Sequence, residues 1–344
     1  MSKKKRTLVA LLIGGLLLVP AWQGAEASLA PFQTYVGNFM PSTDGGGSTG
    51  QTYSLQANAI AGATVEAAYL YAATFDFGIP PISTPAGTTL NGSAVAFGPK
   101  VPNSTACCGI ASFRADVTSI VKPVIDGGLG GLYNFAVVEG SGAMDGTALV
   151  VVLKHASFPT ASVNISDGFA SVTGDSTAVN FADPLHPGDA GFFAEMRLGI
   201  GFSCCSQKST VTVNGTLITI NAGNNDDGLG SIDNGQLITM GGDGDPFSAL
   251  LPSYANDHER YNLVPQITDG DTTINILTAN ASKDDNIFLG VFYVTGVAGF
   301  NEPPPPPPCD NPPCVPAVPA PASLILLGTG LVGAAVTWRR RASR

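Results

Sequence analysis

Short apolar stretches bounded by Gly, Asn, Asp and Pro run through the chain from residue 28 to residue 302. In TVEAAYLYAATF, every second residue from Val65 to Phe75 falls on one face, which is the pattern of a strand buried on one side. TALVVVLKH is continuously apolar, which is typical of a strand buried on both sides. The pattern therefore predicts an all-β fold.

Two Asn-Gly pairs stand between β-prone segments, at Asn91-Gly92 in TLNGSAV and at Asn214-Gly215 in VTVNGTLITI. Asn-Gly is the strongest short-range hairpin signal, because both residues accept positive φ. A single helical turn is expected at DVTSIV, where Asp116 can cap the first amides and Pro123 would stop the helix.

The two halves of the body repeat a similar order of segments. VEAAYLYAATF, the Asn91 hairpin, LYNFAVVE and DGTALVVVLKH in the first half are followed in the same loose order by GFFAEMRLGIGF, the Asn214 hairpin, YNLVPQI, DTTINILTA and DDNIFLGVFYVTG in the second. We therefore expect two tandem antiparallel β-sandwiches of jelly-roll type, at residues 28–165 and 166–301. The alternative is one larger sandwich whose strands share only β composition.

The first 27 residues have the order of a secretory signal peptide. Four basic residues at positions 3–6 precede an apolar run from Leu8 to Val19, and Ala25-Glu26-Ala27 offers small residues to signal peptidase. The sequence thus predicts export, a signal helix at residues 1–27 and cleavage near Ala27.

The charge of the exported body differs from that of the whole chain, which is −10. Half of the 16 basic residues lie in the two ends, whereas only Glu26 of the 26 acidic residues does. The body therefore carries 25 acidic against 8 basic side chains, a formal charge of −17. Such a surface disfavours nucleic acid and anionic lipid as partners.

An even number of cysteines in an exported chain favours disulfides over metal thiolates, because Cys-Cys pairs lack the C-x-x-C spacing of zinc sites. We expect bridges between the two vicinal pairs and a local bridge in CDNPPC, although six cysteines allow fifteen pairings. The disulfide candidates are Cys107, Cys108, Cys204, Cys205, Cys309 and Cys314.

The segment NAGNNDDGLGSIDNGQLITMGGDGDP is dense in Asn, Asp and Gly and is long for a loop. Carboxylates and turned backbone carbonyls are the ligands that calcium takes, so calcium is the candidate cofactor; a solvated loop is the alternative. The candidate calcium ligands are Asp226, Asp227, Asp233, Asp243 and Asp245.

Catalytic motifs are missing around the three histidines, His155, His186 and His258, which accompany neither H-E-x-x-H nor G-x-S-x-G. Glycosidases on β-sandwiches use paired carboxylates, for which the candidates are Asp257 with Glu259 and Asp284 with Asp285. Because neighbouring acids in loops are usually solvated, we expect a protein that is not an enzyme.

The C-terminal region changes in composition after residue 301. Residues 302–321 form a proline-rich linker that we expect to be an extended spacer of about 3 Å per residue. Residues 322–338 are apolar and long enough for a marginal transmembrane helix, followed by an arginine cluster that stays cytoplasmic by the positive-inside rule.

A proline motif, a short apolar helix and terminal arginines at residues 318–344 resemble the PEP-CTERM sorting signal of Gram-negative bacteria. The V-P-x-P-x-S run of that family is matched by four residues, while Ala320 stands where Glu is usual. The resemblance implies cleavage by an exosortase, a membrane cysteine protease, and delivery to the cell surface or exopolysaccharide matrix. The residues of the signal are Val318, Pro319, Ala320, Pro321, Ser323, Arg339, Arg340 and Arg341.

The body resembles β-rich exported proteins of uncharacterised role, in segments such as ADVTSIV and DDNIFLGVFYV. Taken together, these features lead us to expect a non-enzymatic structural or binding protein of the cell surface or matrix, with extracellular polysaccharide as a possible ligand. The alternative function is a secreted carbohydrate-active hydrolase on a β-sandwich scaffold.

Overall fold

The structure is a computed structural model that describes residues 29–75, 85–102, 109–171, 174–201, 209–220, 222–223, 238–252, 258–280 and 287–304. Strands dominate the described residues, and the strand pairings among them are antiparallel, which confirms the all-β prediction. The described residues from 29 to 303 belong to one compact unit.

Two sheets of the compact unit are built from the N-terminal half of the body. The first inner sheet has the order β2 (Phe39–Gly46), β10 (Met144–Lys154), β4 (Thr64–Thr74), β8 (Ala111–Asp116), β7 (Val101–Pro102). The first outer sheet has the order β3 (Thr52–Ala59), β9 (Gly131–Val138), β5 (Thr89–Leu90), β6 (Ser93–Ala94). Together with helix α1 (Thr118–Ile125), these sheets form the first sandwich.

The other two sheets form the second sandwich. The second inner sheet has the order β1 (Ala30–Gly37), β11 (Ala161–Asp167), β19 (Ile287–Thr295), β13 (Ala194–Ile200), β16 (Thr239–Met240), and β17 (Arg260–Asn262) also pairs with β13. The second outer sheet has the order β15 (Thr216–Thr219), β14 (Ser209–Val213), β18 (Thr273–Asn280), β12 (Asp175–Phe181), β20 (Ala298–Phe300). A short 3-10 helix, η1 (Val264–Gln266), precedes β18.

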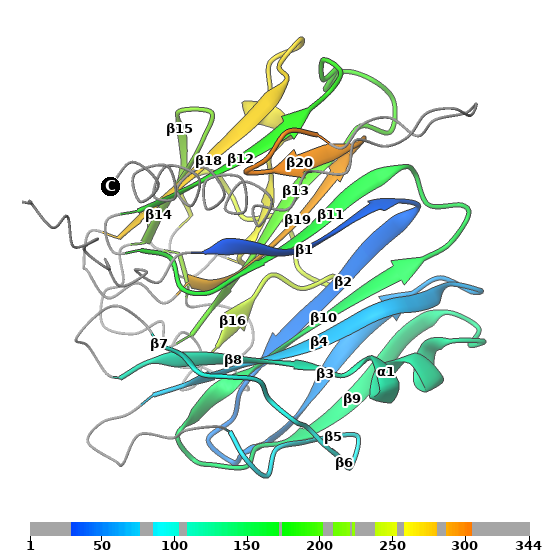
Figure 1. Ribbon diagram of the computed structural model, residues 1–344, viewed down its shortest axis with the longest axis vertical. Helices are drawn as coiled ribbons and strands as arrows, with labels where there is room; N and C mark the ends of the chain where they lie inside the picture. Colours follow the sequence, from blue (N-terminus) through cyan, green and yellow to red (C-terminus); the bar gives the residue numbers. More distant parts are fainter. Residues whose placement is uncertain are drawn as a thin grey trace, which may run out of the picture. The chain divides into compact units, whose positions relative to one another are not determined.

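Three apolar cores hold the four sheets in a stack (Figure 1). The first core lies inside the first sandwich, and the second core lies inside the second sandwich. The third lies between the two inner sheets, where Val150 of β10 and Phe288 of β19 belong to the same buried cluster. Because both faces of each inner sheet are covered, the two sandwiches share one continuous buried interior.

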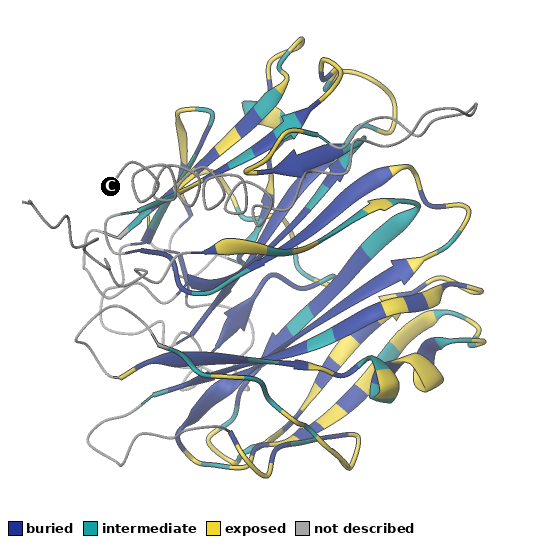
Figure 2. Cartoon of the chain, in the orientation of Figure 1, coloured by how far each residue is buried: buried dark blue, intermediate teal, exposed yellow. Residues whose placement is uncertain are grey.

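The central strands explain why some apolar runs are continuous and others alternate. In β10, Leu149, Val151 and Leu153 enter the first core, while Ala148, Val150 and Val152 enter the third. Figure 2 shows this strand buried along its length, whereas exposed and buried residues alternate in β3 and β9 of the outer sheet. The prediction of a doubly buried strand at TALVVVLKH is confirmed.

The prediction that β4 buries only one face is wrong. Residues from Leu70 to Thr74 are all buried, because β4 lies between β10 and β8 in an inner sheet that packs on both sides. The alternating pattern holds only at the start of the strand, from Thr64 to Ala67.

The two sandwiches do not follow the predicted domain boundary. Strand β1 of residues 30–37 joins the second inner sheet by pairing with β11, and residues 165 and 166 lie inside β11 itself. The next strand, β2, belongs to the first inner sheet. The structure therefore does not confirm separate tandem sandwiches; it shows two sandwiches joined through the third core, with β1 of the N-terminal half in the inner sheet of the second.

The internal repeat extends to sheet topology. The order β2-β10-β4-β8 in the first inner sheet matches β11-β19-β13-β17 in the second, and β3-β9-β5-β6 in the first outer sheet matches β12-β18-β14-β15 in the second. Within this repeat, LYNFAVVE forms β9, whose counterpart is β18 in DTTINILTA, whereas YNLVPQI forms the end of β17 and η1.

The two Asn-Gly hairpins repeat at the level of single contacts. Asn91 and Asn214 have φ of 47° and 46°, and the glycine after each is also positive, as the predicted tight turns require. The Asn91 carboxamide oxygen accepts the amide of Ala136 at 2.7 Å, and the Asn214 oxygen accepts the amide of Asn275 at 2.8 Å. Both hairpin predictions are confirmed.

Helix α1 is longer than predicted. Asp116 does accept the amide of Thr118 at 2.9 Å, but Pro123 lies inside the helix instead of ending it. The helix continues to Ile125 because its apolar side packs on the first core, to which Val121 and Ile125 belong. Tertiary packing thus outweighs the local cost of the proline.

Both predicted terminal helices, at residues 1–27 and 322–338, lie outside the described residues, as does all but the start of the linker at 302–321. Within the ranges given above, no helix has the length and apolar character that crossing a membrane requires.

Candidate functional site

A cleft of about 590 Å³ lies in the second sandwich, at the connection between β12 and β13. This volume is within the range of about 300–1,000 Å³ that is usual for small-molecule sites. Apolar side chains line it, among them Phe181, Phe192 and Leu185, together with Pro159 and Pro184. Asp183, His186 and Asp189 are the ionisable residues of the lining.

The wall formed by residues 182–193 is held by backbone hydrogen bonds. Leu185 donates its amide to the Asp271 carbonyl at 2.7 Å and accepts the Gly270 amide at 2.9 Å. Its side chain is buried in the core of the second sandwich. Two tight turns follow, in which the Asp189 amide bonds the His186 carbonyl and the Phe192 amide bonds the Asp189 carbonyl. The cleft is thus preformed by the fold.

His186 ties the rim of the cleft to the turn before β18. Its Nδ1 lies 2.8 Å from Oδ1 of Asp269, and both side chains are more than half exposed. The hydrogen bond to Asp269 and the charge of that residue raise the pKa of His186 above its usual value. The bond to Nδ1 orients the imidazole ring and leaves Nε2 for other contacts.

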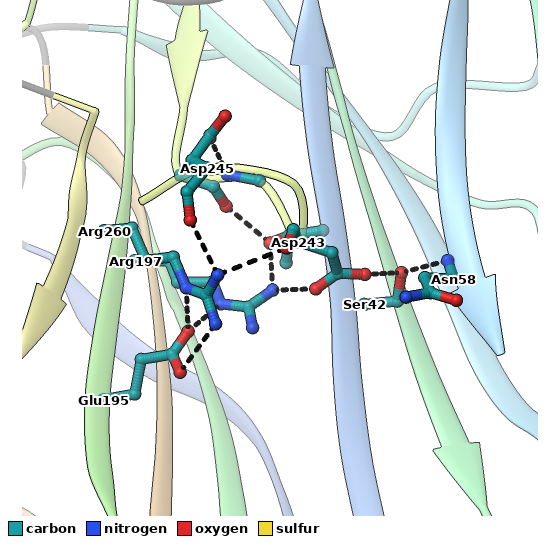
Figure 3. Close-up of polar contacts among 10 residues, drawn as sticks. Ser42, Asn58, Glu195, Arg197, Asp243, Asp245 and Arg260 are labelled. Carbon is teal, nitrogen blue, oxygen red and sulfur yellow. Dashed lines mark hydrogen bonds and ion pairs between the residues drawn. The ribbon is translucent and has the colours of Figure 1, made fainter. Parts of the chain in front are cut away.

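A second polar assembly joins the two sandwiches; we call Ser42, Thr43, Glu195, Arg197, Asp243 and Arg260 the polar clamp (Figure 3). Arg197 is only 4% exposed and lies 2.5 Å from both Glu195 and Asp243, and it donates to Thr43 of the first inner sheet at 2.7 Å. Arg260 of β17 binds Glu195 from the other side at 2.9 Å. Ser42 of β2 donates to Asp243.

The clamp connects three of the four sheets. The Ser42 hydroxyl that binds Asp243 also accepts the Asn58 amide of β3 in the first outer sheet, at 2.9 Å. Buried charges cost free energy unless they are paired and hydrogen-bonded, and here two carboxylates face two guanidinium groups. Coulombic attraction to Arg197, partly offset by burial, holds the pKa of Glu195 below its usual value. The arrangement is suited to fixing the sandwiches in register.

Two predicted calcium ligands lie at or beside this clamp. Asp243 is engaged by Arg197 and Ser42, and Asp245 accepts the amide of Gly242 at 2.5 Å. Asp226, Asp227 and Asp233 lie outside the described residues. In the part of the chain that the structure describes, no group of three or more His, Cys, Asp or Glu side chains is placed to hold a metal ion. Calcium binding stays a prediction.

Of the candidate catalytic pairs, only Glu259 is described. It is fully buried, its carboxylate accepts the Gly223 amide, and it lies 3.1 Å from the Tyr261 hydroxyl. These contacts are those of a residue that stabilises the fold. Asp257, Asp284 and Asp285 lie outside the described residues. His155 bonds Ser157 in a local turn, and the His258 amide bonds Ser248.

Glu139 is an acidic residue whose environment the sequence analysis did not single out. It follows β9, is 5% exposed, and neither of its carboxylate oxygens has a hydrogen-bond partner in the described structure. The neighbouring Tyr53 hydroxyl lies 2.9 Å from Thr147. Burial raises the pKa of Glu139 to about 7. This carboxyl group is therefore close to half ionised at neutral pH.

All six cysteines, and all residues of the sorting signal from Val318 to Arg341, lie outside the described residues. The disulfide pairing therefore stays a prediction. The cleft and the clamp were missed because their residues are far apart in sequence. The available signal was the length of residues 182–193, a connection rich in Pro, Gly and Asp that nonetheless contains three aromatic or imidazole rings.

Comparison with known proteins identifies the C-terminal region. Residues 317–341 match the model of the PEP-CTERM protein-sorting motif. The chain therefore carries a signal for export and surface sorting, which implies processing by an exosortase. No curated protein matches the chain.

Two solved structures show low similarity to the body: wild-type BuGH86 and a BuGH86 variant, each in complex with neoagarooctaose. The sequence identities are 8% and 9%, and the TM-scores are 0.23 and 0.24. The alignments cover 77% of this chain and 34% of each BuGH86 chain, so this chain spans about a third of their length. At these TM-scores the similarity carries no conclusion about fold or activity.

Proposed function

We propose that this chain is a non-enzymatic structural or binding protein of the cell surface or exopolysaccharide matrix. The observation that carries the proposal is the PEP-CTERM motif at residues 317–341, which follows a compact body that ends at residue 303. In this proposal the body is the part that functions outside the cell, and the C-terminal segment directs it there and is then removed.

Two features of the body support a structural or binding role. The four stacked sheets and the polar clamp give a rigid unit, which suits a protein that must persist outside the cell. The excess of acidic residues favours solubility there. Glu259 is engaged within the fold rather than offered to a substrate, which speaks for a role other than hydrolysis.

Intact-mass analysis of the protein released from the cell surface tests the sorting step. We expect a mass that lacks both residues 1–27 and the C-terminal segment with Trp338 and the arginines. A variant with Arg339, Arg340 and Arg341 replaced by Ser serves as the control, because loss of the positive stop should retain unprocessed protein. Surface protein of wild-type sequence that still contains Trp338 would overturn the proposed processing.

Ala320 offers a sharper test, because it stands where the motif usually has Glu. We expect Ala320→Glu to increase the processed fraction relative to wild type in a pulse-chase experiment. The hydrolase alternative is tested separately by incubating the full chain with neutral and acidic polysaccharides. No release of reducing ends is expected, and release that increases with time would contradict a non-enzymatic role.

A further inference from the structure

Among the described residues, the cleft at residues 182–193 has no counterpart at the equivalent connection of the first sandwich, whose own opening lies elsewhere, between the Asn91 hairpin and α1. In the first sandwich, β3 and β4 are joined by the four residues 60–63, whereas the equivalent strands β12 and β13 are joined by the twelve residues 182–193. In the first sandwich the short turn packs directly on Gly130, where an added Cβ would lie 2.4 Å from the Ala61 amide nitrogen. No room for a cleft remains there.

The longer connection is not needed to close the fold, because its four-residue counterpart already joins the same two strands. It is nevertheless ordered by the Leu185 bonds to residues 270–271 and by the contact between His186 and Asp269. Long ordered connections in compact domains are usually functional. The insertion therefore points to a ligand site and not to a structural requirement.

The lining of the cleft selects a class of ligand. Phe192, which is only partly buried, offers aromatic surface, and Phe181 adds the 7% of its surface that is left exposed; such surface suits the apolar C–H face of a sugar ring, because the ring faces of aromatic groups are electron-rich. Asp183 and Asp189 are exposed carboxylates that can accept hydrogen bonds from hydroxyl or ammonium groups. The described lining contains no Lys or Arg, and its two carboxylates, Asp183 and Asp189, outnumber the single imidazole of His186, so the site disfavours carboxylate, phosphate or sulfate groups.

We propose that this cleft binds a pyranose unit of a glycan that carries no negative charge. Phe192 and Phe181 pack against the ring, and Asp183 and Asp189 accept its polar hydrogens. Both hexoses and amino sugars have this chemistry. The inference rests on the proposed function, since it assigns the surface-displayed body a glycan ligand and a place to bind it.

Binding is tested by saturation-transfer NMR and calorimetry on the full chain with three sets of short oligosaccharides: neutral, amino-sugar and uronic-acid. We expect the neutral set or the amino-sugar set to bind. The difference in affinity between these two sets shows whether Asp183 and Asp189 accept hydrogen bonds from hydroxyl or from ammonium groups. No binding of either set, or equal binding of the uronic-acid set, would overturn the proposal.

Variants separate the cleft from the rest of the surface. Phe192→Ala should weaken binding at least about tenfold, since an aromatic platform is lost. Because Phe192 also packs against the second core, Ala190→Gln provides a second test that narrows the cleft from an exposed position without removing a core contact. Leu129→Ala, at a residue 95% exposed outside the cleft, is the matched control for loss of apolar surface.

A matched pair of variants tests the acidic side chains of the cleft. Asp183→Asn should weaken binding, whereas Glu66→Gln, which neutralises an exposed acid of β4, should leave it unchanged. Wild-type affinity in both Phe192→Ala and Ala190→Gln would contradict the assignment even if some glycan binds elsewhere. These measurements use purified protein and do not depend on sorting, so failure of this inference and failure of the proposed export are distinguishable.

Discussion

The strands of the two sandwiches are arranged in the same order, but different segments close one end of each sandwich. In the first, helix α1 contributes Val121 and Ile125 to the core, and the turn at residues 60–63 packs on Gly130. In the second, η1 has no buried residue, and the connection at residues 182–193 provides the wall of a cleft. The repeat has thus kept its strands and hairpins, while the connection between the equivalent strands is a short packed turn in the first copy and the wall of a cleft in the second.

The largest expected effect comes from breaking the clamp that joins the two sandwiches. Arg197→Ala leaves Asp243 with the Ser42 hydroxyl but no paired cation and Glu195 with Arg260 alone, which should lower the free energy of unfolding by about 3–5 kcal/mol. Urea denaturation measures this loss. Separate transitions of the two sandwiches would show, in addition, that Arg197 couples them.

The control for Arg197 is an ion pair at the surface of the first sandwich. Lys122 of α1 and Asp126, which directly follows the helix, lie 2.7 Å apart, but Lys122 is about half exposed. Lys122→Gln should therefore cost less than about 1 kcal/mol. Equal losses in the two variants would contradict the role given to the clamp.

A smaller effect, and one that depends on pH, is expected at Glu139 in the first sandwich. Its pKa of about 7 lies above the ordinary value of 4.5, so the folded state binds the proton more tightly than the unfolded state. The folded state accommodates the neutral carboxyl group better than the carboxylate. Its contribution to the free energy of unfolding is fully present below about pH 4.5 and is lost as the pH rises through about 7. The loss amounts to up to about 3 kcal/mol at pH 8.

Glu139→Gln removes this ionisation. The variant should match wild type near pH 4 and should be more stable at pH 8, when both are measured by thermal unfolding across the pH range. A difference that does not change with pH would contradict the account of Glu139.

The smallest effect tests whether the two halves are true repeats. Asn91→Ala and Asn214→Ala each remove the side-chain oxygen that accepts a backbone amide. Each also leaves an alanine at positive φ, where no side-chain hydrogen bond offsets the strain. Each should cost about 1–2 kcal/mol in urea denaturation. The Asn214 carboxamide nitrogen also donates to the Gln266 carbonyl at 2.9 Å, so Asn214→Ala should cost at least as much as Asn91→Ala. Asn→Gly, which keeps the φ but not the bond, should cost less than Asn→Ala at both sites. A clearly larger loss at Asn91 than at Asn214 would contradict the equivalence of the two hairpins.

Local features of this fold were predictable from the sequence. The Asn-Gly turns require positive φ wherever they occur, and the continuous apolar run of β10 requires two covering layers. The position of β1 was not predictable, because nothing within residues 30–37 states which of two inner sheets the strand will join. The one-sided pattern assigned to β4 failed for the same reason: the layer covering its second face comes from the other half of the chain.

The candidate site was less accessible to sequence reasoning. Asp243 was selected as a metal ligand for its acidic loop, yet its partners Arg197 and Ser42 lie far away in the sequence. The cleft is formed by residues 159–160, 181–186, 189–192 and 295–297, which meet only after the second sandwich has assembled. Its aromatic and acidic side chains do lie in one segment, but that segment matches no motif, and the opposite wall comes from residues far away in the sequence.

The central claim is that the second sandwich differs from the first by carrying a glycan site. Backbone amide shifts of the full chain, recorded by NMR while the neutral or amino-sugar oligosaccharide that binds is added, test it most directly. The account predicts perturbations at residues 159–160, 181–192 and 295–297, with residues 60–63 and 126–130 of the first sandwich unchanged. Perturbations at the equivalent turns of both sandwiches, or only outside the cleft, would contradict it.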